Sequence, residues 1–163
     1  METLQLKDIA CYLPYRLKAS YTHTNKIGEI SNVYGLPDND DIKLSIHWED
    51  GEHMWMFKPI LRPISDLYKP LENGTIPILE LAKIVGLKFI RYELGDSSVD
   101  LYLTDRKNNK YRFWYDDFNK GAFRITATGN GNINQLAGFQ FLFKHHFDIF
   151  GLIEKGLAIK YEE

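Results

Sequence analysis

The sequence predicts an α+β fold: an antiparallel sheet of two hairpin or meander groups, about seven to eight strands in all, packed by a long C-terminal helix and a short middle helix. Three observations predict it. Asp50-Gly51 separates two alternating apolar runs, β-rich runs follow one another between residues 88 and 115, and apolar residues recur at helical spacing after residue 132. With 163 residues, the chain has the length of one domain, so we expect a single domain over 1–163.

The first part of the chain predicts one short helix followed by two strands. Residues 4–12 are expected to be helical and to stop before Pro14, because proline cannot continue a helix. Residues 16–22 and 28–34 have the composition of strands, and Asn25-Lys26 lies near the turn between them.

The Asp-Gly pair is the strongest local signal, because a type I′ hairpin turn needs a positive φ at both of its central residues. If Asp50-Gly51 is the two-residue loop, Trp48 pairs with His53 and Ile46 pairs with Trp55. Both tryptophans then lie on one face of the hairpin.

Two prolines mark the segment after the hairpin. Pro59 and Pro63 lack a backbone donor, so residues 57–67 are expected to form an extended connector rather than an inner strand. A helix is then expected over Pro77–Val85, since proline suits the first helical position and Gly86 suits the stop.

The second half predicts a meander and then the longest helix. The expected strands are Lys88–Leu94, Val99–Thr104, Tyr111–Tyr115 and Gly121–Thr126. Asn132 is expected to cap the helix that follows. The apolar residues that recur near helical spacing in that helix are Ile133, Leu136, Ala137, Phe143, Phe147 and Phe150.

Composition excludes several classes of protein. Twenty Lys and Arg oppose twenty-two Asp and Glu, for a formal net charge of −2, so the chain lacks the basic excess of a dedicated nucleic-acid binder. Cys11 is the only cysteine, which excludes an intrachain disulfide and fits a reducing compartment. We expect Cys11 to be buried and inert. We find no signal peptide and no run apolar enough to span a bilayer, so we expect a cytoplasmic protein.

The candidate catalytic and metal-binding residues do not form a convincing site, and we expect no cofactor. Gly129-Asn130-Gly131 fails the dinucleotide fingerprint because Asn134 occupies the third glycine position. His145 and Asp148 could share a helix face, but two ligands are fewer than a zinc site needs. Asp116-Asp117 is expected to be a pair of solvated acids at a strand end. The sequence therefore predicts a protein that is not an enzyme.

The run Arg112–Phe118 gives the best functional signal from the residues alone. On a strand, Arg112 and Trp114 lie on the face opposite Phe113 and Tyr115, and the late helix can cover only one of these faces. The other face is expected to be an exposed aromatic patch that binds a protein, although stacking on single-stranded nucleic acid is an alternative use. The predicted partner-binding residues are Arg112, Trp114, Tyr115, Trp48 and Trp55.

Three blocks of the chain resemble an uncharacterised small protein family encoded in phages and prophages of Bacteroidota. The blocks are Tyr12–Lys18, Lys58–Leu67 and His146–Ile159, and they follow in the expected order over nearly the whole chain. Their prolines and glycines indicate a structural role. The resemblance implies a mobile-element setting but no site residues, since the family carries no agreed activity.

That setting implies a binding function. Small phage proteins without catalytic motifs commonly act by binding, and one class of them inhibits host defence. We therefore expect a non-enzymatic protein that binds a host protein, in particular an anti-CRISPR-like inhibitor of a nucleic-acid-targeting defence nuclease. The alternative is a nucleic-acid-associated or phage-assembly accessory protein. Direct binding to nucleic acid or to a membrane is not expected.

Overall fold

The computed structural model describes residues 4–21, 26–36, 39–48, 51–55, 57–94, 98–105, 107–116, 122–127 and 133–162. Two compact units make up the chain. The first consists of Met1–Arg62, Phe143–Asp148 and Leu152–Glu163, and the second consists of Pro63–Leu142 and Ile149–Gly151. Helices and mainly antiparallel sheets occur together in the described ranges, which confirms the mixed α and β class. The single domain stays a prediction.

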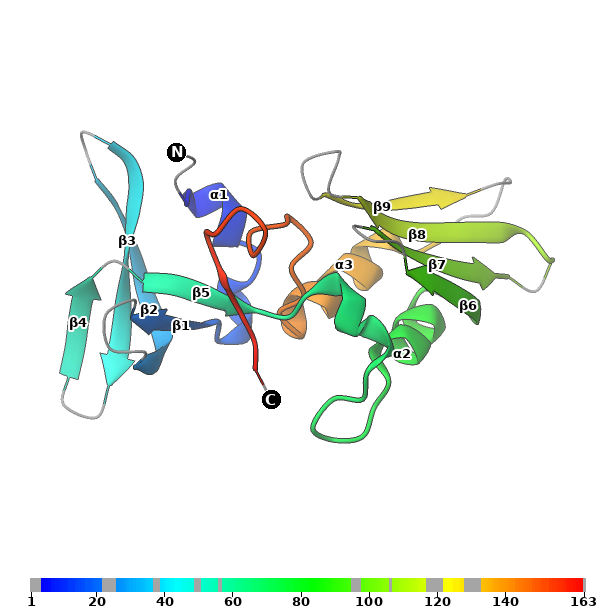
Figure 1. Ribbon diagram of the computed structural model, residues 1–163, viewed down its shortest axis with the longest axis horizontal. Coiled ribbons are helices and arrows are strands. Elements are labelled where there is room, and N and C mark those ends of the chain that lie inside the picture. The colour runs from blue at the N-terminus through cyan, green and yellow to red at the C-terminus, as the bar shows by residue number, and fades with distance from the viewer. Residues whose placement is uncertain are drawn as a thin grey trace. The chain divides into compact units, whose positions relative to one another are not determined.

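A six-stranded sheet, counted over the described residues, forms the first unit, with strand order β10-β5-β1-β2-β3-β4. Figure 1 labels its strands β1 to β5. The short helices α1 (Leu6–Ile9) and η1 (Leu13–Tyr15) precede it. Its strands are β1 (Lys18–Tyr21), β2 (Ile27–Leu36), β3 (Asn39–Trp48), β4 (Gly51–Trp55), β5 (Phe57–Leu61) and β10 (Ile159–Lys160). β10 pairs with β5 in parallel, whereas the other neighbours are antiparallel.

The predicted hairpin is present as β3 and β4, but its register differs from the expected one. Trp48 pairs with Gly51 and Ile46 pairs with His53, so Gly51 is the first residue of β4. The predicted pairing of Trp48 with His53 is therefore wrong by two residues. A shift of two residues preserves the alternation along both strands, which is why the apolar pattern could not distinguish the two registers.

β5 is an inner strand, so the prediction of an extended connector over residues 57–67 is wrong for its first part. Pro59 lies in β5 opposite Ala19 of β1. The missing donor is tolerated because β10 pairs with Ile60 and Leu61 only, beyond the proline. The short helix η2 (Ile64–Tyr68) follows directly.

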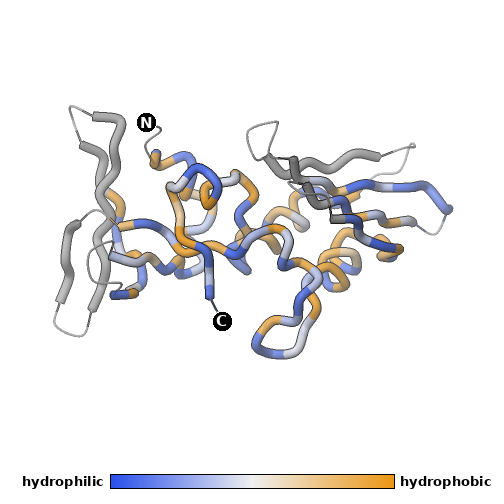
Figure 2. Tube along the Cα trace, in the orientation of Figure 1, coloured by the Kyte–Doolittle hydropathy of each residue, from blue (hydrophilic) through white to orange (hydrophobic). Residues whose placement is uncertain are grey.

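An antiparallel meander, β6-β7-β8-β9, forms the sheet of the second unit. Its strands are β6 (Lys88–Leu94), β7 (Ser98–Thr104), β8 (Lys110–Asp116) and β9 (Ala122–Ala127), close to the predicted bounds. The helix α2 (Pro77–Ile84) packs against β6, and Gly86 follows it with φ 77°, which confirms the predicted stop. Apolar residues recur along α2 (Figure 2), where Ile78 and Leu81 are buried.

The last helix is shorter than predicted. α3 spans Gln135–Lys144, and the Asn134 side chain accepts the N–H of Ala137 at 3.1 Å, so Asn134 caps the helix. The predicted cap, Asn132, lies outside the described residues, as does Gly129-Asn130-Gly131. The long C-terminal helix is not confirmed.

Turns replace that helix after Lys144, and the reason lies in competing backbone contacts. His146 has φ 57°, which breaks the helical path. The backbone N–H of Asp148 donates to the carbonyl of Arg62 at 2.7 Å instead of to a helical carbonyl. The apolar spacing that reaches Phe147 therefore reflects burial in a turn, since Phe147 is fully buried and bridges to Arg62.

Candidate functional site

The strand β8 separates its side chains between two faces of the second unit's sheet. Tyr111 and Phe113 are buried on the inner face. Arg112 is exposed and Trp114 is half-buried on the opposite face, which we call the outer face. Of the other three predicted binding residues, Tyr115 in β8, Trp48 in β3 and Trp55 in β4 are placed by their backbone only, and their side chains lie outside the described part.

Arg112 is held in place on the outer face by two neighbours. Its Nε donates to Oδ1 of Asp100 at 2.7 Å, and its guanidinium carbon lies 5.4 Å from the centre of the Trp114 ring. The strand register explains the contacts, because Asp100 of β7 is directly opposite Trp114 of β8. The hydrogen bond to Asp100 raises the pKa of Arg112, so this guanidinium stays charged.

A second set of contacts of the same kind lies next to the first. Arg91 and Glu93 of β6 form an ion pair at 3.0 Å. The Tyr102 hydroxyl donates to Oε2 of Glu93 at 3.1 Å, and the Arg91 guanidinium lies 4.6 Å from the centre of the Tyr102 ring. Tyr102 is opposite both Arg91 and Arg112 in the register, so the two sets are adjacent on the outer face.

Together these side chains form what we call the outer-face cluster: Arg91, Glu93, Asp100, Tyr102, Arg112 and Trp114. Within the cluster, each arginine contacts a carboxylate and an aromatic ring. Its two arginines balance its two acids, so the cluster carries no formal net charge. The contacts restrict the long arginine side chains before any partner binds, which lowers the entropy lost on binding. Such a surface offers flat rings and fixed polar groups to a protein partner.

Sequence reasoning missed four members of the cluster. Arg91, Glu93, Asp100 and Tyr102 lie on β6 and β7, and only the strand register reveals that they surround Arg112. The turn between β7 and β8 contained a usable signal. The Asp105 carboxylate accepts the N–H groups of Lys107 and Asn109 at 2.8 and 2.9 Å, which fixes the turn and with it the register.

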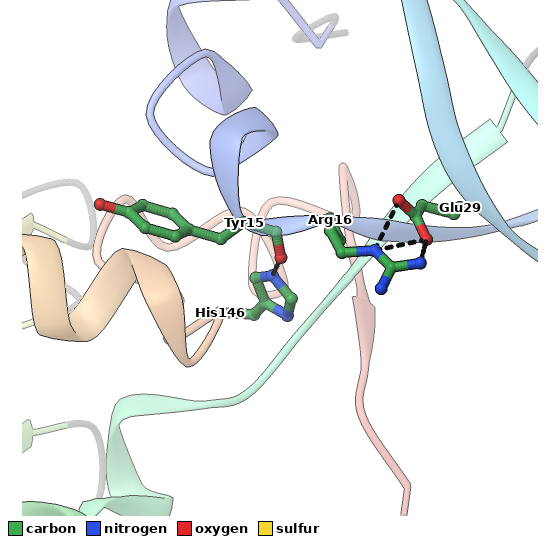
Figure 3. A network of polar contacts seen from close by, with 4 residues as sticks. All are labelled: Tyr15, Arg16, Glu29 and His146. Atoms are coloured by element: carbon green, nitrogen blue, oxygen red, sulfur yellow. Dashed lines mark hydrogen bonds and ion pairs between the residues drawn. The ribbon is translucent and has the colours of Figure 1, made fainter.

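The residues considered for other chemistry are engaged in structural roles. Cys11 is half-buried rather than buried as expected. This partial burial raises the pKa of its thiol to about 11, which leaves the thiol protonated near neutral pH. His146 follows α3 in a turn, with Nε2 2.9 Å from the carbonyl oxygen of Tyr15, next to the exposed pair of Arg16 and Glu29 (Figure 3).

The metal site considered from His145 and Asp148 does not form in the described structure. The two carboxylate oxygens of Asp148 accept the N–H groups of Leu152 and Ile153 at 2.9 and 2.8 Å. Among the residues whose positions are described, no group of three or more His, Cys, Asp or Glu could hold a metal ion. The side chain of Asp116 lies outside that part of the chain, as does Asp117.

The three blocks that carry the family resemblance meet in the first unit. The Tyr12 hydroxyl donates to the carbonyl oxygen of Phe147 at 2.8 Å in the interior. The backbone of Arg62 bonds to His146 and Asp148 on either side of Phe147. These contacts join the first, second and third blocks, and they support the structural role that their prolines and glycines indicate.

Comparison with known proteins found no family model, no curated protein and no solved structure that matches the chain. The resemblance to phage-encoded proteins therefore stays a prediction. Within the described residues, no helix combines the length and the apolar character needed to cross a membrane.

Proposed function

We propose that the protein is a non-enzymatic, phage- or prophage-encoded protein that binds a host protein through the outer-face cluster. The observation that carries the proposal is the pair of Arg–aromatic contacts, Arg112 with Trp114 and Arg91 with Tyr102, on the outer face of one sheet. Arg, Trp and Tyr are the residue types most enriched among the binding hot spots of protein interfaces.

The charges of the cluster favour a protein partner over nucleic acid. A surface that binds phosphates needs cationic groups that are not neutralised by acids of the same protein. Here Asp100 pairs with Arg112 and Glu93 pairs with Arg91. The neutral cluster and the formal net charge of −2 both argue against direct binding to nucleic acid.

The class of partner follows from the resemblance to proteins of mobile elements. We propose that the target is a nucleic-acid-targeting defence nuclease of the bacterial host, such as a CRISPR nuclease, and that inhibition takes place in the cytoplasm. Inhibition would follow from occupying a surface that the nuclease needs, so it requires shape and fixed polar groups rather than a catalytic group.

The test is a pull-down from host lysate after nuclease digestion, with the co-purified proteins identified by mass spectrometry. We expect one host protein at near-equal amounts with the wild-type chain. Arg112→Ala and Trp114→Ala should weaken binding to that purified protein by tenfold or more, because hot-spot truncations typically cost at least ~2 kcal/mol. Lys83→Ala on α2 is the matched control, an exposed cation of the same unit outside the cluster.

Circular dichroism of each variant separates loss of binding from loss of fold. Folded Arg112→Ala and Trp114→Ala variants that bind like the wild type would contradict the proposed surface. Capture of phage structural proteins alone, or of material that disappears with nuclease digestion, would contradict the proposed target and favour an assembly or nucleic-acid-associated role.

A further inference from the structure

The strand β6 lies at one edge of the sheet in the second unit. Among the described residues, β7 is its only neighbouring strand, and no strand pairs with its other edge. An open edge presents unpaired backbone N–H and C=O groups, which readily pair with another chain. A bulge interrupts the pairing of β6 with β7 between Phe89 and Arg91, but the pairing is regular from Arg91 to Leu94. The regular stretch is thus an available template for a further strand.

Exposed apolar side chains concentrate beside this edge. Of the eight large apolar side chains that are exposed in the described residues, five lie on β6 or at α2, which packs against β6. The five are Ile76, Leu79, Ile84, Ile90 and Tyr92. Tyr92 is 43% exposed even though its ring stacks on Tyr68 with the ring centres 4.8 Å apart. A partner that pairs with β6 would cover part of this apolar surface.

The charges along β6 are complementary to those of a second copy of the strand that runs antiparallel to it. If two copies pair antiparallel with Tyr92 opposite Tyr92, each Arg91 lies opposite Glu93 of the other copy. A pairing centred on Arg91 places two guanidinium groups opposite each other, and one centred on Glu93 places two carboxylates opposite each other. Opposite charges directly across a strand pair are favourable and like charges are not, so only the pairing centred on Tyr92 satisfies both residues.

We propose that the protein forms a homodimer in which β6 pairs antiparallel with β6 of a second copy, with Tyr92 at the twofold axis. The two four-stranded sheets then form one continuous sheet, and the α2 helices of the two copies lie on the same side of it. This arrangement pairs the open edge and brings together the exposed Tyr92 side chains of the two copies. It goes beyond the proposed function and does not depend on a host partner.

The first experiment uses two charge reversals at the edge and measures molecular mass by sedimentation velocity. We expect a dimer for the wild-type chain at micromolar concentration. Arg91→Glu alone and Glu93→Arg alone should each weaken dimerisation by about tenfold or more, because each places like charges opposite at two positions. An equimolar mixture of the two variants should form a heterodimer, since every facing pair is then of opposite charge.

The mixture isolates the contact between chains. Each variant keeps two like charges at positions 91 and 93 of its own strand, so mixing cannot repair an effect within one chain. Circular dichroism confirms that both variants are folded. A monomeric wild-type chain at micromolar concentration overturns the proposal, and so does a mixture of folded variants that stays monomeric.

A second experiment tests the register with single cysteines in a Cys11→Ser background. Tyr92→Cys should form a disulfide-linked dimer on mild oxidation, because the two substituted positions face each other across the axis. Ile90→Cys is the matched control on the same strand, since its two copies are separated by four residues, about 13 Å along the strand. Equal cross-linking of both variants, or cross-linking of Ile90→Cys only, overturns the proposed pairing.

Discussion

Asp148 shows at the scale of one residue how the C-terminal turns are held. It is buried, and both of its carboxylate oxygens accept backbone N–H groups, from Leu152 and Ile153. Asp148→Ala should lower the free energy of unfolding by about 2–4 kcal/mol, because it leaves two backbone donors without an acceptor in the interior. Asp148→Asn keeps one acceptor and should lose about half as much. Urea unfolding measures both changes, and an alanine variant as stable as the wild type would contradict this account.

The lowered pKa of His146 predicts that the stability of the fold decreases in mild acid. Burial lowers the pKa of His146, and the positive charges of Arg62 and Lys18 lower it further, against the opposing effect of the Tyr15 carbonyl. Below about pH 6.5 the unfolded chain binds a proton that the folded chain resists. This contribution to stability is therefore complete above that pH and is lost as the pH falls toward the lowered pKa.

The check is to compare urea unfolding at pH 7.5 and pH 5.5 for the wild type and His146→Asn. Asparagine tolerates the positive φ of this position and can donate to the Tyr15 carbonyl without titrating. The variant should lose less stability between the two pH values than the wild type. Part of the acid loss should remain, because burial also lowers the pKa of His145. An identical loss in both proteins would rule out His146 as a source.

At the scale of elements, Gly138 sets how closely α3 approaches α2. A Cβ at this position would lie 3.0 Å from Cγ1 of Val85 and 3.6 Å from Cδ1 of Leu81. Gly138→Ala should change stability by less than about 1 kcal/mol, because the better helix propensity offsets a small shift of Val85. Gly138→Leu should cost about 1–3 kcal/mol through overpacking.

Thermal unfolding distinguishes the two Gly138 variants. Gly86→Ala is a useful contrast, because a Cβ there meets open space and only the positive φ of 77° opposes it. It should destabilise by about 1 kcal/mol without any packing change. A leucine at position 138 that is tolerated as well as alanine would show that α2 and α3 are not in close contact there.

The elements that the sequence predicted well are those with strong local signals. The bounds of β6 and α2 agree with the predicted ones within about a residue, because alternation and a Pro–Gly frame mark them. Long-range contacts decided the others. Pro59 is tolerated in an inner strand because β10 pairs only with the two residues that follow it. α3 ends early because the backbone N–H of Asp148 donates to the carbonyl of Arg62.

In the candidate site too, local signals were predictable from the sequence and long-range contacts were not. Strand alternation predicted that Arg112 and Trp114 share a face, since that depends only on their spacing. The neighbours Asp100 and Tyr102 could not be predicted, because a cross-strand neighbour depends on register, and register depends on the five-residue turn that Asp105 fixes. The residues that turn Arg112 into part of a cluster therefore became visible only in the structure.

At the scale of the whole molecule, the end of the chain closes the first unit. β10 adds a strand to β5, and the N–H of Tyr161 donates to the carbonyl oxygen of Leu61 at 2.8 Å. The guanidinium of Arg62 lies 3.8 Å from the centre of the Tyr161 ring. Buried side chains just before β10, Leu152 and Ala158, belong to the same closing segment.

Deletion of residues 159–163 should therefore weaken the first unit without unfolding it. The loss of the backbone pairing between β10 and β5, of one cation–π contact and of the half-buried Ile159 should cost at least about 2 kcal/mol. Hydrogen exchange should rise in β5, which loses a neighbour, and stay unchanged in β8 of the second unit. A deletion that begins at Leu152 should instead unfold the first unit, because it also removes the donors to Asp148. Equal exchange in β5 with and without residues 159–163 would show that β10 does not stabilise this edge.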